Sequence, residues 1–165
     1  FRIYTNTDVT GVELAGAVKN VIAIASGIAR GIGYGVNTSA ALITRGNAEI
    51  VRLGISLGAK IETFFGLAGI GDLMLTALSD QSRNFSFGKL LGQGLSFEEA
   101  KSHIQTVIEG IDTVKSAKSL AKKQGVEMPI VETVYRVLFE ELSPLNAVKE
   151  LMSRDLKSES FIKSK

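Results

Sequence analysis

Lys19 interrupts the most apolar stretch of the 165-residue chain, the run from Leu14 to Ala29. An ammonium group is costly to bury without a partner, so it must reach water, pair with a carboxylate, or serve a chemical purpose. That purpose would be proton exchange, because partial burial makes an amine easier to deprotonate. Asn20 points about 100° away from it on a helix and can bond either a ligand or a facing backbone group. Lys19 is therefore a candidate acid–base group, with surface exposure or ion pairing as the alternative.

Two later segments carry polar groups that suit a ligand. Asp72 follows a Gly-Ile-Gly stretch, so its carboxylate can approach a ligand hydroxyl or a lysine; the alternative is a helix cap. Further on, four polar residues, Gln81, Ser82, Arg83 and Asn84, follow one another between apolar segments. A hydroxyl, a planar guanidinium and an amide are donors that bind a phosphate well, and free backbone amides would add to them if a helix begins there. The alternative for this second segment is a solvated loop.

The composition excludes several kinds of site. There is no cysteine, which rules out disulfides, thiolate metal sites and cysteine catalysis, and His103 is the sole histidine. The net charge is 19 − 17 = +2 with scattered basic residues, which does not indicate nucleic-acid or membrane-surface binding. The glycines of 31–35 follow a helix and lack the G-x-G-x-x-G spacing of a dinucleotide loop. The apolar run of 14–29 is shorter than the ~20 residues of a membrane span. We expect a soluble, cytoplasmic protein without a metal site or membrane insertion.

A long helix must position Lys19. The stretch from Val9 to about Gly31 threads glycine and alanine among valine and isoleucine. Each glycine weakens an isolated helix by about 1 kcal/mol relative to alanine, so this helix is plausible only where it is buried against close neighbours. A second helix is predicted from a cap at Asn37 to about Leu57, with Arg45 and Glu49 able to pair on its polar side.

Helix signals continue to the C-terminal region. After a broken, glycine-punctuated region over 61–78, Ser96 and Glu99 form a predicted capping box. A helix closed by Gly125 follows, then helices opened by Pro129 and by Ser143-Pro144. Residues 1–6 alternate as an edge strand does, without an evident partner. The predicted fold class is all-α, a multi-helix domain built around the long buried helix.

The ordered motifs of the chain resemble the C-terminal domain of the bacterial-type NAD(P)-dependent glycerol-3-phosphate dehydrogenases. The matching segments are DVTGVE (8–13), AVKNVIAI (17–24), GIGYGVN (31–37), ALITRG (41–46), GIGDL (69–73), QSRN (81–84), Gly88, LGQG (91–94), VIEG (107–110) and Met128-Pro129. Each motif is short, but the series runs in the family's order from the first residues to about Leu151, which makes it specific.

The resemblance implies a fold like the C-terminal domain of 6-phosphogluconate dehydrogenase and a division of the chain into three parts. Residues 1–8 would be the end of a missing Rossmann-type domain, 9–156 the helical substrate-binding and catalytic domain, and 157–165 a polar tail. NAD or NADP would be bound mainly by the missing domain, so the fragment alone is expected to be inactive. A homodimer is also implied.

The family's activity is the interconversion of sn-glycerol 3-phosphate and dihydroxyacetone phosphate, which supplies glycerol 3-phosphate for phospholipid synthesis. By resemblance, Lys19 accepts the proton of the substrate's C2 hydroxyl. The residues implied to bind substrate are Lys19, Asn20, Asp72, Thr76, Ser82, Arg83 and Asn84. The residues implied to contact the cofactor are Arg83, Val107 and Glu109.

Two other functions are compatible with the sequence. One is the helical domain of a related dehydrogenase that acts on a hydroxy acid or on a sugar phosphate. The phosphate-binding donors of residues 82–84 favour the sugar phosphate over the hydroxy acid. The other is a non-enzymatic helical dimerisation module, in which replacing Lys19 would cost no turnover.

Overall fold

The computed structural model describes residues 2–153, and within this range it contains no β-strand. The helices are α1 (Val9–Ile32), α2 (Val36–Ser56), α3 (Ile61–Phe65), the π-helical turn η1 (Leu67–Gly71), α4 (Asp72–Leu78), α5 (Arg83–Gly92), α6 (Phe97–Ser102), α7 (Glu109–Gln124), α8 (Pro129–Phe139) and α9 (Pro144–Met152). The predicted all-α class is confirmed. The predicted edge strand is wrong over residues 2–6, which have no strand partner to satisfy their backbone groups. The predicted polar tail, 157–165, lies outside the described residues.

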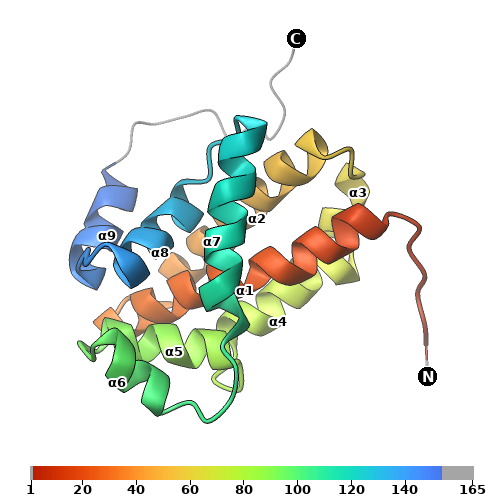
Figure 1. Cartoon of the computed structure of the whole chain (residues 1–165). Coiled ribbons are helices and arrows are strands. Elements are labelled where there is room, and N and C mark those ends of the chain that lie inside the picture. The colour runs from red at the N-terminus through yellow and green to blue at the C-terminus, as the bar shows by residue number, and fades with distance from the viewer. Residues whose placement is uncertain (1, 154–165) are drawn as a thin grey trace.

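Helix α1 is the central element, and α2, α4, α5 and α7 pack around it (Figure 1). Asp8 caps its start, with a side chain that accepts a hydrogen bond from the Gly11 amide, and Gly33 caps its end, with a positive φ of 108° that turns the chain. Its length and hydropathy would also suit a membrane span, but 67% of its apolar window is buried inside the fold. The predicted buried, central role of this helix is confirmed.

Glycines bring α1 and α5 into backbone contact. A Cβ on Gly27 of α1 would lie 2.1 Å from the carbonyl oxygen of Phe85, and one on Gly88 of α5 would lie 2.1 Å from that of Ile24. Because both obstacles are backbone atoms, no side-chain rearrangement could relieve them. This close approach explains why a glycine-rich sequence forms a stable helix here, as predicted.

Two predictions for α2 are wrong. Asn37 is not the cap: the helix starts one residue before it, and Gly35, in extended conformation, takes the capping position without a side-chain bond. Glu49 does not face the polar side, because it is 1% exposed and its carboxylate accepts the backbone amides of Ile130 and Val131 at the start of α8. A carboxylate that satisfies free amides at a helix start acts as a cap from another helix.

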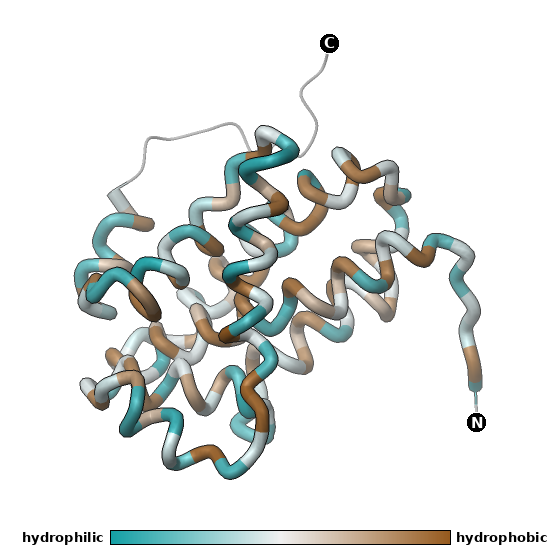
Figure 2. Tube along the Cα trace, in the orientation of Figure 1, coloured by the Kyte–Doolittle hydropathy of each residue, from teal (hydrophilic) through white to brown (hydrophobic). Residues whose placement is uncertain are grey.

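The predicted signals at the start of α6, the end of α7 and the starts of α8 and α9 are confirmed. The capping box of Ser96 and Glu99 is present at α6, and Gly125 ends α7 with a φ of 64°. Pro129 and Pro144 stand at the first positions of α8 and α9. Hydrophilic and hydrophobic residues alternate along α7, as expected for a helix with one buried face (Figure 2).

Candidate functional site

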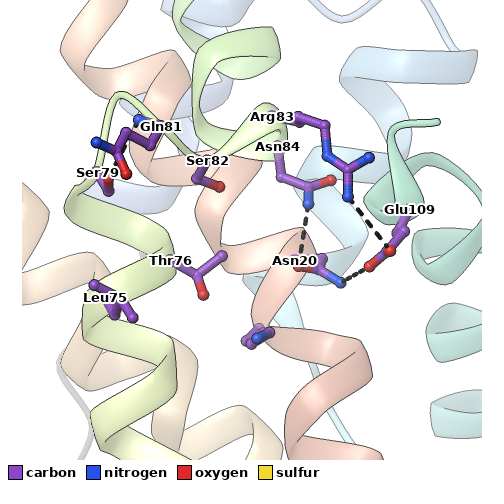
Figure 3. A pocket seen from close by; sticks show the side chains of 10 residues that line it. Asn20, Leu75, Thr76, Ser79, Gln81, Ser82, Arg83, Asn84 and Glu109 are labelled. Atoms are coloured by element: carbon purple, nitrogen blue, oxygen red, sulfur yellow. Dashed lines mark hydrogen bonds and ion pairs between the residues drawn. The ribbon is translucent and has the colours of Figure 1, made fainter. Parts of the chain in front are cut away.

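A pocket of about 330 Å³ opens where α4, the start of α5 and the start of α7 meet the middle of α1 (Figure 3). Its lining comprises Lys19, Asn20, Leu75, Thr76, Ser79, Gln81, Ser82, Arg83, Asn84 and Glu109. Six of the sequence-predicted substrate residues therefore lie around one cavity, although they come from three separate stretches of the chain. The seventh, Asp72, is bonded to the lysine of this set.

Lys19 pairs with Asp72. Its Nζ donates to the Asp72 Oδ2 at 2.5 Å, and the two side chains are 21% and 35% exposed. The ion pair predicted from the sequence as an alternative is therefore present, and the same lysine also lines the pocket. Asp72 is the first residue of α4 and does not cap it, because its side chain turns to α1. Thr76, one turn later, donates its hydroxyl to the Asp72 carbonyl oxygen at 2.7 Å and lies 3.4 Å from Oδ1.

The π-helical turn η1 sets the direction of α4 and hence of Asp72. Inside the turn, Gly69 has a non-helical backbone conformation (φ −102°, ψ −105°). A Cβ there would lie 2.4 Å from the carbonyl oxygen of Phe64, so a larger residue would push η1 away from α3. Gly69 therefore serves close packing, and this packing brings the carboxylate of Asp72 to Lys19.

The Ser82–Asn84 segment starts a helix rather than forming a solvated loop. The Ser82 hydroxyl caps α5 by accepting the Phe85 amide at 3.3 Å. Arg83, the first residue of α5, has a side chain that is 48% exposed, and its Nη2 lies 3.7 Å from Oε1 of Glu109. Asn84 is buried at 6% exposure. The guanidinium is thus the group of this segment that is most open to a ligand.

A chain of amide hydrogen bonds joins α1, α5 and α7 beside the pocket (Figure 3). The Asn84 Nδ2 donates to Asn20 Oδ1 at 3.0 Å, and the Asn20 Nδ2 donates to Glu109 Oε2 at 3.1 Å. The Asn84 Oδ1 accepts the backbone amide of Gly110 at 2.9 Å. Both ends of the Asn84 amide are therefore engaged within the protein, and the side chain holds the start of α7 against the other two helices.

Not every predicted contact residue lies in the pocket. Val107 is 70% exposed on the segment before α7 and does not line the cavity. The site-residue prediction omitted Leu75, Ser79 and Gln81, which do line it. Leu75 stands three residues after Asp72, so helical spacing from that carboxylate would have found it.

Both cations that line the pocket have a carboxylate partner, Lys19 with Asp72 and Arg83 with Glu109. An amine held by a carboxylate can exchange a proton with a nearby hydroxyl or carbonyl oxygen. A half-exposed guanidinium at a helix start suits an anion such as a phosphate. The arrangement is therefore able to bind a phosphorylated small molecule and to move a proton on it.

Comparison with known proteins gives matches along nearly the whole chain. A sequence model of the NAD-dependent glycerol-3-phosphate dehydrogenase C-terminus matches residues 8–149. A glycerol-3-phosphate dehydrogenase (NAD(P)+) of Geobacter sulfurreducens is 58% identical over 161 residues, covering 98% of this chain and 48% of the relative. One from Staphylococcus aureus strain JH9 is 59% identical over 158 residues, covering 96% and 48%. The chain thus spans about half the length of these curated relatives.

Solved structures share the same fold. The crystal structure of glycerol-3-phosphate dehydrogenase from Coxiella burnetii matches with a TM-score of 0.91 at 49% identity, covering 93% of this chain and 47% of that one. The Saccharomyces cerevisiae glycerol-3-phosphate dehydrogenase structure matches with a TM-score of 0.80 at 28% identity, covering 89% and 43%.

Proposed function

Because the chain belongs to the NAD-dependent glycerol-3-phosphate dehydrogenase family, as its C-terminal domain, we propose that it is the substrate-binding half of an enzyme that interconverts sn-glycerol 3-phosphate and dihydroxyacetone phosphate. The observation that carries this proposal is that Lys19, paired with Asp72, and Arg83 line the same pocket. An amine and a guanidinium on one cavity suit a small molecule that has a reacting oxygen at one end and a phosphate at the other.

Arg83 binds the phosphate in this proposal. Its guanidinium is half-exposed and extends from the first position of α5, where free backbone amides add to its attraction for an anion. The Ser82 hydroxyl and Thr76 line the same cavity and offer further polar contacts to the substrate. Binding the phosphate end holds the reacting carbon near Lys19, so that binding energy is used for orientation.

Lys19 exchanges the proton. In the direction of oxidation its amine accepts the proton of the C2 hydroxyl, and in the direction of reduction its ammonium group donates a proton to the carbonyl oxygen. Asp72 holds the amine at 2.5 Å, and Thr76 in turn contacts Asp72. Asn20 and Asn84 keep the adjoining turn of α1 in place.

NAD or NADP, when bound, would supply the acceptor or donor of the hydride at C2. The rim of the pocket fits such a group, because the exposed guanidinium of Arg83 and carboxylate of Glu109 are partners for phosphate and ribose hydroxyls. Val107, exposed two residues before Glu109, is the third proposed cofactor contact. Most of the cofactor would be bound by a Rossmann-type domain that precedes this one, with residues 1–8 at its end and 9–156 forming the helical domain.

Three further properties belong to this proposal. The whole enzyme is a homodimer, it is soluble and cytoplasmic, and it supplies glycerol 3-phosphate for phospholipid synthesis. The burial of the apolar face of α1 inside the fold supports solubility. Size-exclusion chromatography with light scattering would test the dimer, and a monomer at micromolar concentration would contradict it.

The test uses a chimera in which this chain replaces the matching half of the Geobacter sulfurreducens relative. We expect it to oxidise NADH or NADPH with dihydroxyacetone phosphate, and to do so far more slowly with dihydroxyacetone, which has no phosphate. Arg83→Gln should lower kcat/KM for dihydroxyacetone phosphate by about 10- to 100-fold, which corresponds to the free energy of a charge-assisted hydrogen bond. The same change should leave kcat/KM for dihydroxyacetone unchanged. A folded chimera that does not distinguish the two substrates would contradict the proposal, as would turnover by the 165-residue chain alone.

A further inference from the structure

We propose that Glu109 is a resident anion that holds Arg83 in the unliganded pocket, and that an incoming phosphate must displace it. Its two carboxylate oxygens have different partners. Oε1 lies 3.7 Å from Arg83 Nη2, and Oε2 accepts the Asn20 Nδ2 at 3.1 Å. The inference rests on the proposed function, because it takes Arg83 as the group that binds the substrate's phosphate.

The backbone of Glu109 is fixed in this position. The next amide, that of Gly110, donates to the buried Asn84 Oδ1 at 2.9 Å. A Cβ on Gly110 would lie 2.6 Å from Ile24 Cδ1, 2.7 Å from Asn84 Oδ1 and 3.0 Å from the Asn20 carbonyl oxygen, so a larger residue would force these neighbours to shift. The carboxylate therefore stands at Arg83 because the helix start beneath it is anchored.

The side chain of Glu109, in contrast, can leave. It is 58% exposed, and it could rotate into water without moving α7, at the cost of the hydrogen bond from the buried Asn20 Nδ2. A phosphate that reaches Arg83 while Glu109 remains would place two anions side by side, which is unfavourable at short range. The phosphate must therefore compete with an internal carboxylate for the same guanidinium.

The solvent exposure of the Arg83 and Glu109 side chains determines how strongly Glu109 competes with phosphate. Both side chains of the pair are about half exposed, at 48% and 58%, and their closest charged atoms are 3.7 Å apart. Exposed ion pairs of this kind are weak, so removing the carboxylate should strengthen phosphate binding by about two- to fivefold. This makes Glu109 a moderating residue that weakens the affinity for phosphate and speeds its release, rather than a block.

The experiment measures binding of inorganic phosphate to the 165-residue chain by isothermal titration calorimetry at neutral pH. Glu109→Gln removes the charge and keeps an oxygen that can accept from Asn20, so it should bind phosphate about two- to fivefold more tightly than the wild type. Glu98→Gln is the matched control, since it removes one exposed carboxylate on α6, outside the pocket lining, and should bind as the wild type does. The difference should shrink at high salt, where exposed charges are screened.

Equal or weaker phosphate binding by Glu109→Gln, or a similar gain in Glu98→Gln, would overturn the inference. Glu109→Ala, checked for folding by circular dichroism, provides a second variant that should also bind more tightly. Arg83→Gln separates the two proposals. If phosphate binding survives that change at wild-type strength, the assignment of the phosphate to Arg83 fails; if it is lost while Glu109→Gln shows no gain, only the displacement of Glu109 fails.

Discussion

Replacing Asn84 by alanine should strongly destabilise the domain. The side chain is 6% exposed and bridges three helices through two hydrogen bonds of 3.0 and 2.9 Å. Its removal leaves Asn20 Oδ1 without its donor and the Gly110 amide without its acceptor, and both groups stay buried. A buried polar group that loses its partner costs about 1–3 kcal/mol, so two such groups should lower the free energy of unfolding by about 2–6 kcal/mol.

Urea unfolding followed by circular dichroism gives this free energy, and hydrogen exchange of the Gly110 amide reports the lost bond itself. Asn84→Asp should keep the protection of the Gly110 amide that Asn84→Ala loses, because a carboxylate still accepts from Gly110 although it cannot donate to Asn20. Asn37→Ala, an exposed change inside α2, is the control and should stay within about 0.5 kcal/mol of the wild type. The reasoning is refuted if Asn84→Ala unfolds with the same free energy as that control, or if protection of the Gly110 amide is unchanged.

Two further changes test the packing and the start of α1. Gly88→Ala places a Cβ 2.1 Å from a backbone oxygen of α1 and should lower the unfolding free energy by about 1–3 kcal/mol or more. Gly16→Ala, with no atom within 4 Å of the added Cβ, should instead stabilise the domain by about 0.5–1 kcal/mol. Equal denaturation midpoints for the two variants would contradict the backbone contact. Hydrogen bonds from the Thr63 hydroxyl and the Lys60 amide hold the pKa of Asp8 below its ordinary value of 3.8. The stability that ionised Asp8 contributes is therefore present above pH 3.8 and lost as the pH falls through its folded pKa. The melting temperatures of the wild type and Asp8→Asn should converge at low pH. A difference between the two melting temperatures that does not vary with pH would contradict this role of Asp8.

Local signals predicted the helices well because their causes are local. The capping box of Ser96 and Glu99, the glycine at 125 and the two prolines each act within a few residues of a helix end, and all of them are found where the sequence indicates. Asn37 failed because a good capping residue does not decide where a helix starts when the preceding turn, closed by Gly33, already leaves Gly35 in the capping conformation.

The sequence pattern could not predict contacts between residues that are far apart in the chain. Lys19 and Asp72 are 53 residues apart. The motifs alone left each with a purely structural alternative, surface exposure or ion pairing for Lys19 and a helix cap for Asp72. Glu49 looks like a surface residue on a helix, yet it is buried because α8, some eighty residues later in the chain, presents its free amides there. The bridge through Asn84 likewise depends on how three helices meet, which no spacing along the chain encodes.

The role of Lys19 is tested most directly by its replacement with methionine in the chimera with the Geobacter sulfurreducens relative. Methionine keeps an unbranched side chain of similar size and removes the amine, so kcat for the reduction of dihydroxyacetone phosphate should fall by about 10²- to 10⁴-fold while the protein stays folded. Lys89→Met, on an exposed lysine of α5 that pairs with Asp80, should leave kcat unchanged. A Lys19→Met enzyme that retains the wild-type kcat would contradict the account.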